Sequence, residues 1–169
     1  MTRYVALLRA VNVGGTGKLP MAELKKMAEA AGFLRPRTYI ASGNLVFESA
    51  AGEPRIVEVL EAALERYAGK PVGVLVRDAA ALVRVRDANP FPDEPGNRVM
   101  AVFLGDPPPE DAIARATGRR GEDIRMGARE LYVHYPDGMA ETRLRIPAAA
   151  AGTARNMNTV AALIEMLAS

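Results

Sequence analysis

The sequence predicts an α+β fold that consists of two small ferredoxin-like subdomains, each with helices packed on a sheet. Three observations support this prediction. Short strand-like and helix-like segments alternate along the 169 residues, two of the strand-like segments flank a short hairpin loop, and a breaker-rich stretch at 89–96 interrupts the series. We therefore expect two subdomains, at 1–95 and 96–169, that pack together as one compact unit. A hinge is expected near Pro90.

The first half alternates three strands with three helices. The almost unbroken apolar run at 4–13 is typical of a central strand that is covered on both faces. The second strand, at 37–48, contains Gly43, which indicates either a bulge or the corner of a tight hairpin. Pro and Gly mark helix starts and ends, and Asp78 is expected to cap the third helix. The remaining elements are helices at 21–31, 54–68 and 78–89 and a strand at 72–76.

The second half has fewer clear elements. We expect a strand, a helix, a strand hairpin and a final helix. Neither half shows the full ferredoxin-like set, which leaves room for the halves to share or exchange strands across one core. The expected ranges are strands at 99–104, 122–126 and 131–135, a helix at 108–117, and a final helix that contains 160–167.

The composition excludes several classes of site. With no cysteine, the chain has no disulfide, no thiol nucleophile and no zinc site built on thiolates. Its single histidine, His134, rules out a metal site with several histidines from one chain, so we expect no metal and no cofactor. The amino terminus lacks a signal-peptide pattern, and no apolar run approaches the ~20 residues of a membrane span. We therefore expect a cytoplasmic protein without a membrane partner.

The charges are nearly balanced, with 22 Lys and Arg against 20 Asp and Glu. Residues 1–95 carry 13 basic and 11 acidic side chains, and 96–169 carry 9 of each. A nucleic-acid-binding domain usually concentrates its basic residues on one face. A nucleic-acid partner stays open, but the charge distribution does not indicate one.

A glycine-rich loop at 14–18 lies between the first strand and the first helix, where a phosphate cradle would be expected. It does not fit the phosphate-loop template, because Asn12 stands where the first glycine belongs and Leu19 stands where a Ser or Thr is required. The loop is therefore either a plain turn or a looser anion-binding nest with Lys18 as a point charge.

Arg9 interrupts the apolar run of the first strand. It lies on the opposite face of that strand from Asn12, because the two positions differ by an odd number of residues. Two roles stay open for Arg9: an ion pair with a carboxylate such as Glu48, or contact with a ligand.

Ser42 and His134 are the candidate catalytic residues. Ser42 resembles part of a nucleophile elbow, but the G-x-S-x-G spacing is absent and no activating base is identifiable, which favours a bulge residue. His134 alternates with Val133 and Tyr135 in an expected strand, where a lone histidine is usually a surface or hydrogen-bonded residue. The sequence leaves open whether the protein is an enzyme.

A polar run, Thr-Ala-Arg-Asn-Met-Asn-Thr at 153–159, leads directly into the final helix. If the helix begins at the start of this run, Asn156 projects toward the apolar face. If it begins later, Asn158 becomes the amino-terminal cap. Either arrangement places Arg155 beside a helix amino terminus, which is suited to an anion.

The segments 7–15, 18–24, 38–47 and 153–160 resemble, in order and along essentially the whole chain, the bacterial family catalogued as domain of unknown function 1697. The resemblance implies a compact α+β protein with ferredoxin-like subdomains, and it carries no established activity. Members of that family commonly have tryptophan where Met157 stands. The resemblance therefore leaves Met157 an apolar filler role rather than a stacking role.

Three functions stay open. The first is a binding module for an anionic or phosphate-bearing ligand, such as a nucleotide or a nucleic-acid end. The second is a metal-independent small-molecule enzyme that uses Ser42 or His134, with arginines as oxyanion stabilisers. The third is an interaction protein whose polar segments lock its halves together. Candidate ligand-binding residues outnumber candidate bases and nucleophiles, so we prefer the binding module. The sequence does not determine an oligomeric state. Some of the polar residues are expected to meet in one cleft between the halves: Arg9, Asn12, Lys18, Ser42, Asn44, Arg155, Asn156 and Asn158.

Overall fold

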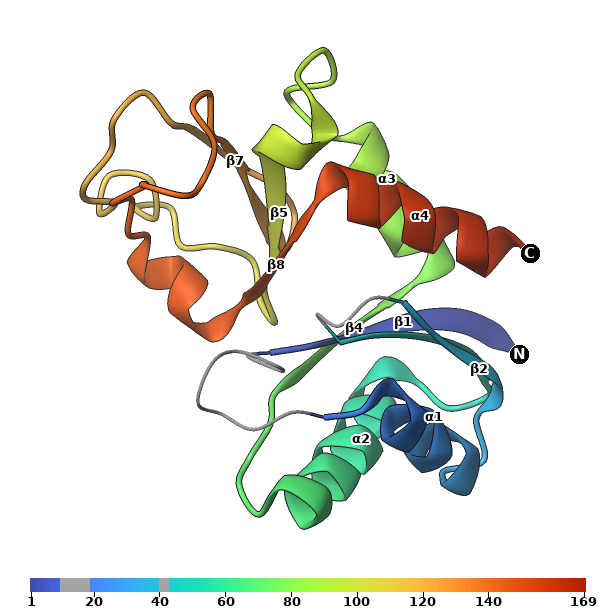
Figure 1. The fold of residues 1–169 in the computed structure, drawn as a ribbon. Coiled ribbons are helices and arrows are strands. Elements are labelled where there is room, and N and C mark those ends of the chain that lie inside the picture. Colours follow the sequence, from blue (N-terminus) through green and yellow to red (C-terminus); the bar gives the residue numbers. More distant parts are fainter. Residues whose placement is uncertain (10–18, 40–42) are drawn as a thin grey trace. The chain divides into compact units, whose positions relative to one another are not determined.

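The structure is a computed structural model that describes residues 1–9, 19–39 and 43–169. The chain divides into two compact units: Met1–Leu82 with Leu163–Ser169, and Val83–Ala162 (Figure 1). The boundaries between the units fall within helices α3 (Ala79–Asp87) and α4 (Met157–Ala168). The elements divided between the units are therefore helices, and each sheet consists of strands that are consecutive in the chain.

A four-stranded antiparallel sheet with the order β2-β3-β1-β4 is the framework of the first unit. The β-α-β-β-α-β order of its elements confirms the expected helix-on-sheet arrangement. The elements are β1 (Thr2–Leu8), α1 (Met21–Ala30), β2 (Leu34–Tyr39), β3 (Asn44–Ser49), α2 (Glu53–Ala68) and β4 (Val74–Asp78).

The core of the first unit lies between its sheet and helices α1 and α2, which cover one face of the sheet (Figure 1). Tyr4 and Ala6 of β1 face this core, because alternate side chains of a strand point to the same face. The intervening residues Val5 and Leu7 are fully buried as well. This burial confirms that β1 is covered on both faces.

The segment expected as one strand at 37–48 forms two strands. Within the antiparallel pair β2 and β3, Thr38 lies opposite Leu45. Gly43 precedes β3 with φ = 83°, a left-handed conformation that glycine adopts readily. The hairpin interpretation of Gly43 is therefore confirmed. The register shift in this sheet lies elsewhere, between Leu34 and Arg37.

The second unit is built on a four-stranded antiparallel sheet with the order β6-β7-β5-β8. One face of this sheet packs against turns and a short 3-10 helix, and on the other face the Tyr132 hydroxyl donates to the Val85 carbonyl of α3 over 2.7 Å. The strands are β5 (Val99–Phe103), β6 (Asp123–Met126), β7 (Glu130–His134) and β8 (Thr153–Asn156), and the 3-10 helices are η1 (Gly96–Arg98) and η2 (Pro147–Ala151).

The two sheets repeat the same topology, with β5 to β8 corresponding to β1 to β4. At equivalent points, the Leu8 amide donates to the Gly43 carbonyl and the Leu104 amide donates to the Arg129 carbonyl, each over 2.9 Å. Leu8 and Leu104 each face the core of their own unit. The chain is thus an internal structural repeat, although no repeat is visible in its sequence. The sequence-based division at residue 95 stays a prediction.

The helix expected at 108–117 is wrong, because this segment forms turns. Residues 106–108 each precede a proline, and the residue before a proline is disfavoured in the helical conformation, so a helix does not begin within this run. Two backbone hydrogen bonds after the prolines join residues three positions apart, as in turns. The Ala112 amide donates to the Pro109 carbonyl, and the Ala116 amide donates to the Ile113 carbonyl. The repeat therefore keeps its strands in the second unit, while turns and η2 replace the two helices that cover the first sheet.

Candidate functional site

Arg155 lies on β8, so the polar run at 153–159 begins as a strand and not as part of a helix. Its side chain is buried, and one guanidinium nitrogen donates to the Thr153 hydroxyl over 2.8 Å and to the Ala154 carbonyl over 2.9 Å. Burial removes water from the cation and lowers the pKa of Arg155 to about 10. A guanidinium whose pKa falls in this way lies where positive charge is disfavoured.

Asn156 is the residue that caps α4. Its side-chain oxygen accepts a hydrogen bond from the Thr159 amide over 2.8 Å, and the helix begins at Met157. Both arrangements expected from the sequence are therefore wrong, since the helix begins neither at the start of the polar run nor after Asn158. Asn158 is exposed instead, and its side-chain oxygen occupies the space that a Cβ on Gly96 would fill.

The first unit contains the same arrangement at the end of β4. Arg77 is 1% exposed and donates to the Val76 carbonyl over 3.1 Å, and Asp78 accepts from the Ala81 amide over 2.7 Å at the start of α3. The expected cap at Asp78 is confirmed. Arg77 was not among the residues predicted from the sequence. Its signal is the pattern it shares with Arg155, an arginine followed by Asp or Asn at a strand-to-helix junction.

Arg9 and Asn44 lie at the same end of the two central strands of the first sheet, because Arg9 follows β1 and Asn44 begins β3. Asn44 is fully buried, lies opposite Leu7 and donates from its side-chain nitrogen to the Tyr39 carbonyl over 2.9 Å. The Arg9 amide donates to the Gly73 carbonyl over 2.9 Å at the neighbouring end of β4. The carboxylate suggested for Arg9 lies elsewhere, because the Glu48 carboxylate pairs with Arg35 at 3.1 Å.

The remaining candidates of the first half, Asn12, Lys18 and Ser42, lie outside the described residues. Arg9 and Asn44 belong to the first unit, whereas the Arg155 to Asn158 segment belongs to the second. The single composite cleft expected from the sequence therefore stays a prediction.

His134 lines a cavity of about 360 Å³ in the second unit. Its Nε2 atom lies 3.3 Å from a Glu94 carboxylate oxygen, and its ring centroid lies 5.5 Å from that of Phe91. The Arg125 guanidinium lies over the same Phe91 ring at 5.8 Å. Through these side-chain contacts, the proline-rich stretch at 89–96 packs against strands β6 and β7.

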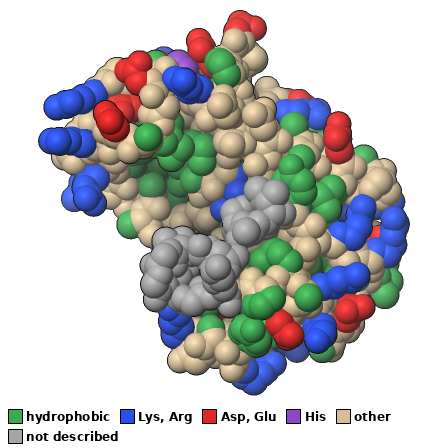
Figure 2. Space-filling view, viewed as in Figure 1, with side chains coloured by type: hydrophobic (Ala, Val, Ile, Leu, Met, Phe, Trp, Pro, Cys, Tyr) green, Lys and Arg blue, Asp and Glu red, His purple; other side chains and the backbone are tan. Residues whose placement is uncertain are grey.

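The charged side chains show no concentrated basic face in the view of Figure 2, where basic side chains lie in several separate groups with acidic ones among them. Within the described ranges, no group of three or more acidic, cysteine or histidine side chains is arranged to hold a metal ion. No helix in the same ranges is long and apolar enough to cross a membrane.

A family model described as "Protein of unknown function (DUF1697)" matches residues 1–132. The chain belongs to the DUF1697 family. The match confirms the resemblance found in the sequence, and it includes Arg9 and Asn44 but ends before the polar run at 153–159. Met157, which follows this run's Asn156, is 8% exposed, as an apolar filler would be.

The conserved bacterial protein SP0830 from Streptococcus pneumoniae has a similar structure, with a TM-score of 0.78 and 22% sequence identity. The similarity covers 98% of each chain. At this identity the likeness establishes the fold that this member of the DUF1697 family shares with SP0830. No curated protein matches the chain.

Proposed function

We propose that the protein is a binding module for a small anionic ligand, with a phosphate-bearing molecule such as a nucleotide or a nucleic-acid end as the preferred class. The observation that carries the proposal is the buried Arg155 guanidinium at the end of β8, directly before the cap of α4. The anion would bind next to Arg155, near the first turn of the helix.

The physical argument rests on the cost of burying a cation. Burial removes water from the Arg155 guanidinium and lowers its pKa to about 10, so the buried site disfavours the charged form. An anion beside the guanidinium would favour the charged form. The partial positive charge at the amino terminus of α4 would add to this attraction.

The other candidate residues take secondary roles in the proposal. Asn156 is engaged as a cap, so it would orient the helix start and not contact the ligand. Asn158 is exposed two positions further along and would contact the anion after its side chain turns away from Gly96. Arg9, Asn12, Lys18 and Asn44 would complete the composite cleft.

A thermal-shift series tests the proposal. We expect inorganic phosphate, pyrophosphate or a 5′-phosphorylated oligonucleotide to raise the Tm, and an unphosphorylated oligonucleotide of the same sequence to do so less. Arg155→Gln should abolish the rise and Arg155→Lys should retain part of it. Arg115→Gln, at an exposed arginine of the same unit, is the matched control.

The opposite result would favour a structural role for the polar segments. If no anion raises the Tm of the native protein, and Arg155→Met strongly destabilises it, the guanidinium and its hydrogen bonds serve the fold alone. The absorbance gives a second readout, because the chain has no tryptophan and five tyrosines. A co-purifying nucleotide would therefore raise the 260 nm signal well above the protein background.

A second candidate function is catalysis with His134 as general base. The Glu94 carboxylate beside Nε2 supports it, because a carboxylate can orient an imidazole for proton transfer. The cavity at His134 would admit a small substrate. Hydrolysis of a panel of activated esters and phosphoesters should fall about a hundredfold in His134→Gln; equal rates in both proteins would reject this function.

A further inference from the structure

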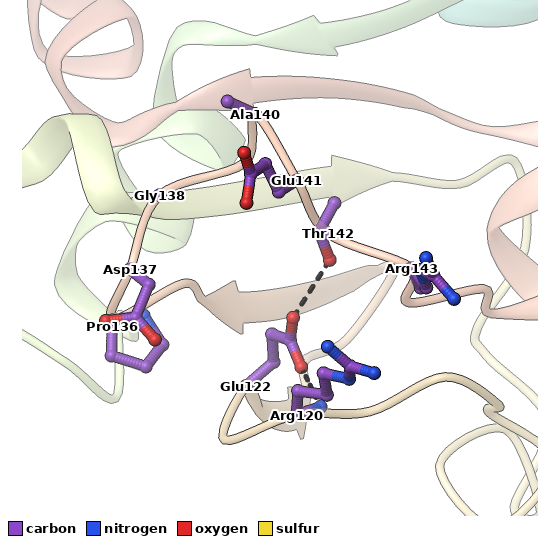
Figure 3. Close-up of a pocket in the computed structure, with 9 residues that line it drawn as sticks. All are labelled: Arg120, Glu122, Pro136, Asp137, Gly138, Ala140, Glu141, Thr142 and Arg143. Atoms are coloured by element: carbon purple, nitrogen blue, oxygen red, sulfur yellow. Dashed lines mark hydrogen bonds between the residues drawn. The ribbon is translucent and has the colours of Figure 1, made fainter.

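A polar cavity of about 310 Å³ lies in the second unit, and none of its lining residues belongs to the proposed anion site (Figure 3). Its walls are the turn before β6 and the loop that follows β7. From the sequence, Glu122 was expected at the start of a strand at 122–126, with no link to the loop. The charged residues that line the cavity are Arg120, Glu122, Asp137, Glu141 and Arg143.

Glu122 joins the two walls of the cavity. One of its carboxylate oxygens accepts from the Arg120 amide, and the other accepts from the Thr142 hydroxyl over 2.9 Å. The same hydroxyl accepts from the Leu144 amide over 3.2 Å, so the loop is fixed at this point. A carboxylate has about four lone-pair sites, and these two hydrogen bonds leave Glu122 with further acceptor capacity toward the cavity.

Four further charged side chains surround this fixed carboxylate: Arg120, Asp137, Glu141 and Arg143. All four residues are exposed, and none of the four side chains forms a hydrogen bond or ion pair with another residue in the described part of the chain. Figure 3 shows Asp137 and Glu141 on one side of the Glu122–Thr142 hydrogen bond, and Arg120 and Arg143 on the other. The cavity therefore has an acidic side and a basic side.

We propose that this cavity binds a zwitterionic small molecule, an amino acid or a dipeptide. The ammonium group would face Asp137 and Glu141, with Glu122 as a further acceptor, and the carboxylate would face Arg120 and Arg143. Guanidinium groups bind carboxylates through paired, charge-assisted hydrogen bonds. The proposal does not depend on the anion site at Arg155.

The charges that line the cavity favour a zwitterion over a simple anion or a simple cation. Three carboxylates against two guanidinium groups disfavour a simple anion, and the two guanidinium groups disfavour a simple cation, because like charges repel in a partly enclosed site. The volume lies at the low end of the range for small-molecule sites, about 300 to 1,000 Å³. A molecule of one or two residues with both charges fits these limits.

An NMR titration with glycylglycine tests the proposal on the full chain. We expect amide shifts at Gly138 and Thr142 that saturate with a Kd of about 1 mM. N-acetyl-glycylglycine lacks the ammonium and glycylglycinamide lacks the carboxylate, so each should bind about tenfold more weakly. Arg143→Gln and Glu141→Gln should weaken glycylglycine to a similar degree, whereas Arg115→Gln, an exposed arginine outside the cavity, should not.

Three results would overturn the proposal. One is the absence of saturable shifts at about 20 mM glycylglycine. Another is equal binding of the two blocked analogues, which would remove the requirement for both charges. The third is the same shifts with inorganic phosphate alone, which would make the cavity a simple anion site. None of these results concerns Arg155, so the zwitterion proposal and the anion-site proposal can be contradicted independently.

Discussion

At the scale of single residues, the polar side chains at strand ends serve the backbone first. Asn156 and Asp78 each satisfy an amide at the start of a helix, and the arginine before each of them folds back onto a strand carbonyl. A buried amide without such a partner would cost about 1 to 3 kcal/mol. The proposed anion site thus uses residues that the fold already holds in place.

The cap at Asn156 gives a prediction on stability. Asn156→Ala should lower the free energy of unfolding by about 1 kcal/mol, because the Thr159 amide loses its acceptor. Asn158→Ala, two positions further along, should change it by less than about 0.5 kcal/mol. Urea unfolding of both variants measures the difference, and a larger loss in Asn158→Ala would show that the cap is misassigned.

Glu122 gives a prediction on pH. The Arg120 amide lowers the pKa of this carboxyl from 4.5, and the Thr142 hydroxyl and Arg119 act in the same direction against desolvation. The folded carboxylate therefore binds a proton more weakly than the unfolded one. Its stabilisation is complete above the unfolded pKa and is lost as the pH falls below 4.5 toward the lower folded value.

The measurement compares Glu122→Gln with the native chain. The free energy of unfolding of the native protein should decline on acidification from neutral pH into this window, and the variant should decline less, since it has no group to protonate at this position. Parallel pH profiles of the two proteins would mean that Glu122 does not contribute.

At the scale of elements, the loop after β7 is fixed by backbone contacts that lie outside any regular sheet. Thr117 and Arg145 exchange two backbone hydrogen bonds of 2.9 and 2.8 Å. Gly118 follows with φ = 73°, and a Cβ there would collide with the Arg143 carbonyl. These contacts hold the loop that lines the cavity beside Glu122.

Gly118→Ala should therefore be strongly destabilising, by about 2 kcal/mol or more, because neither the left-handed backbone nor the Arg143 carbonyl can yield easily. Gly105→Ala is the matched control, since a Cβ at that position meets nothing within 4 Å. Thermal unfolding of the two variants checks the prediction. A native-like Tm for Gly118→Ala would show that the turn adapts.

At the scale of the whole molecule, the chain contributes its last residues to the unit formed by its first. Arg3 donates to the Leu167 carbonyl over 2.7 Å, and Arg37 donates to the Met166 carbonyl over 2.6 Å. Both arginines thereby satisfy carbonyls at the end of α4, where cations are favoured. The first unit is incomplete without the end of the chain.

A chain that ends at residue 162 should lose hydrogen-exchange protection in β1 and β2, although these strands are far from the deletion in sequence. The deletion removes the carbonyls that accept from Arg3 and Arg37 and also the buried Leu163 and Leu167. Glu165→Gln, at an exposed position of the deleted segment, should retain the protection. Unchanged exchange in β1 would contradict the assignment of residues 163–169 to the first unit.

The sequence alone determined the features that depend on local interactions. A nearly unbroken apolar run identified β1, alternating side chains identified β7, and helical spacing identified α1 and α2. Asp78 was recognisable as a cap because it acts on an amide three residues away. The hairpin at Gly43 was one of two open interpretations, since the choice required knowing which strands pair.

Only the tertiary structure decided the features that depend on contacts distant in sequence. The four residues of β8 have no apolar alternation, and pairing with β5, some fifty positions earlier, makes them a strand. The repeat of the two sheets, the start of α4 at Met157 and the meeting of Glu122 with Thr142 follow from such pairings as well. Local propensity cannot specify them, because their stabilisation comes from partners that only the folded chain brings together.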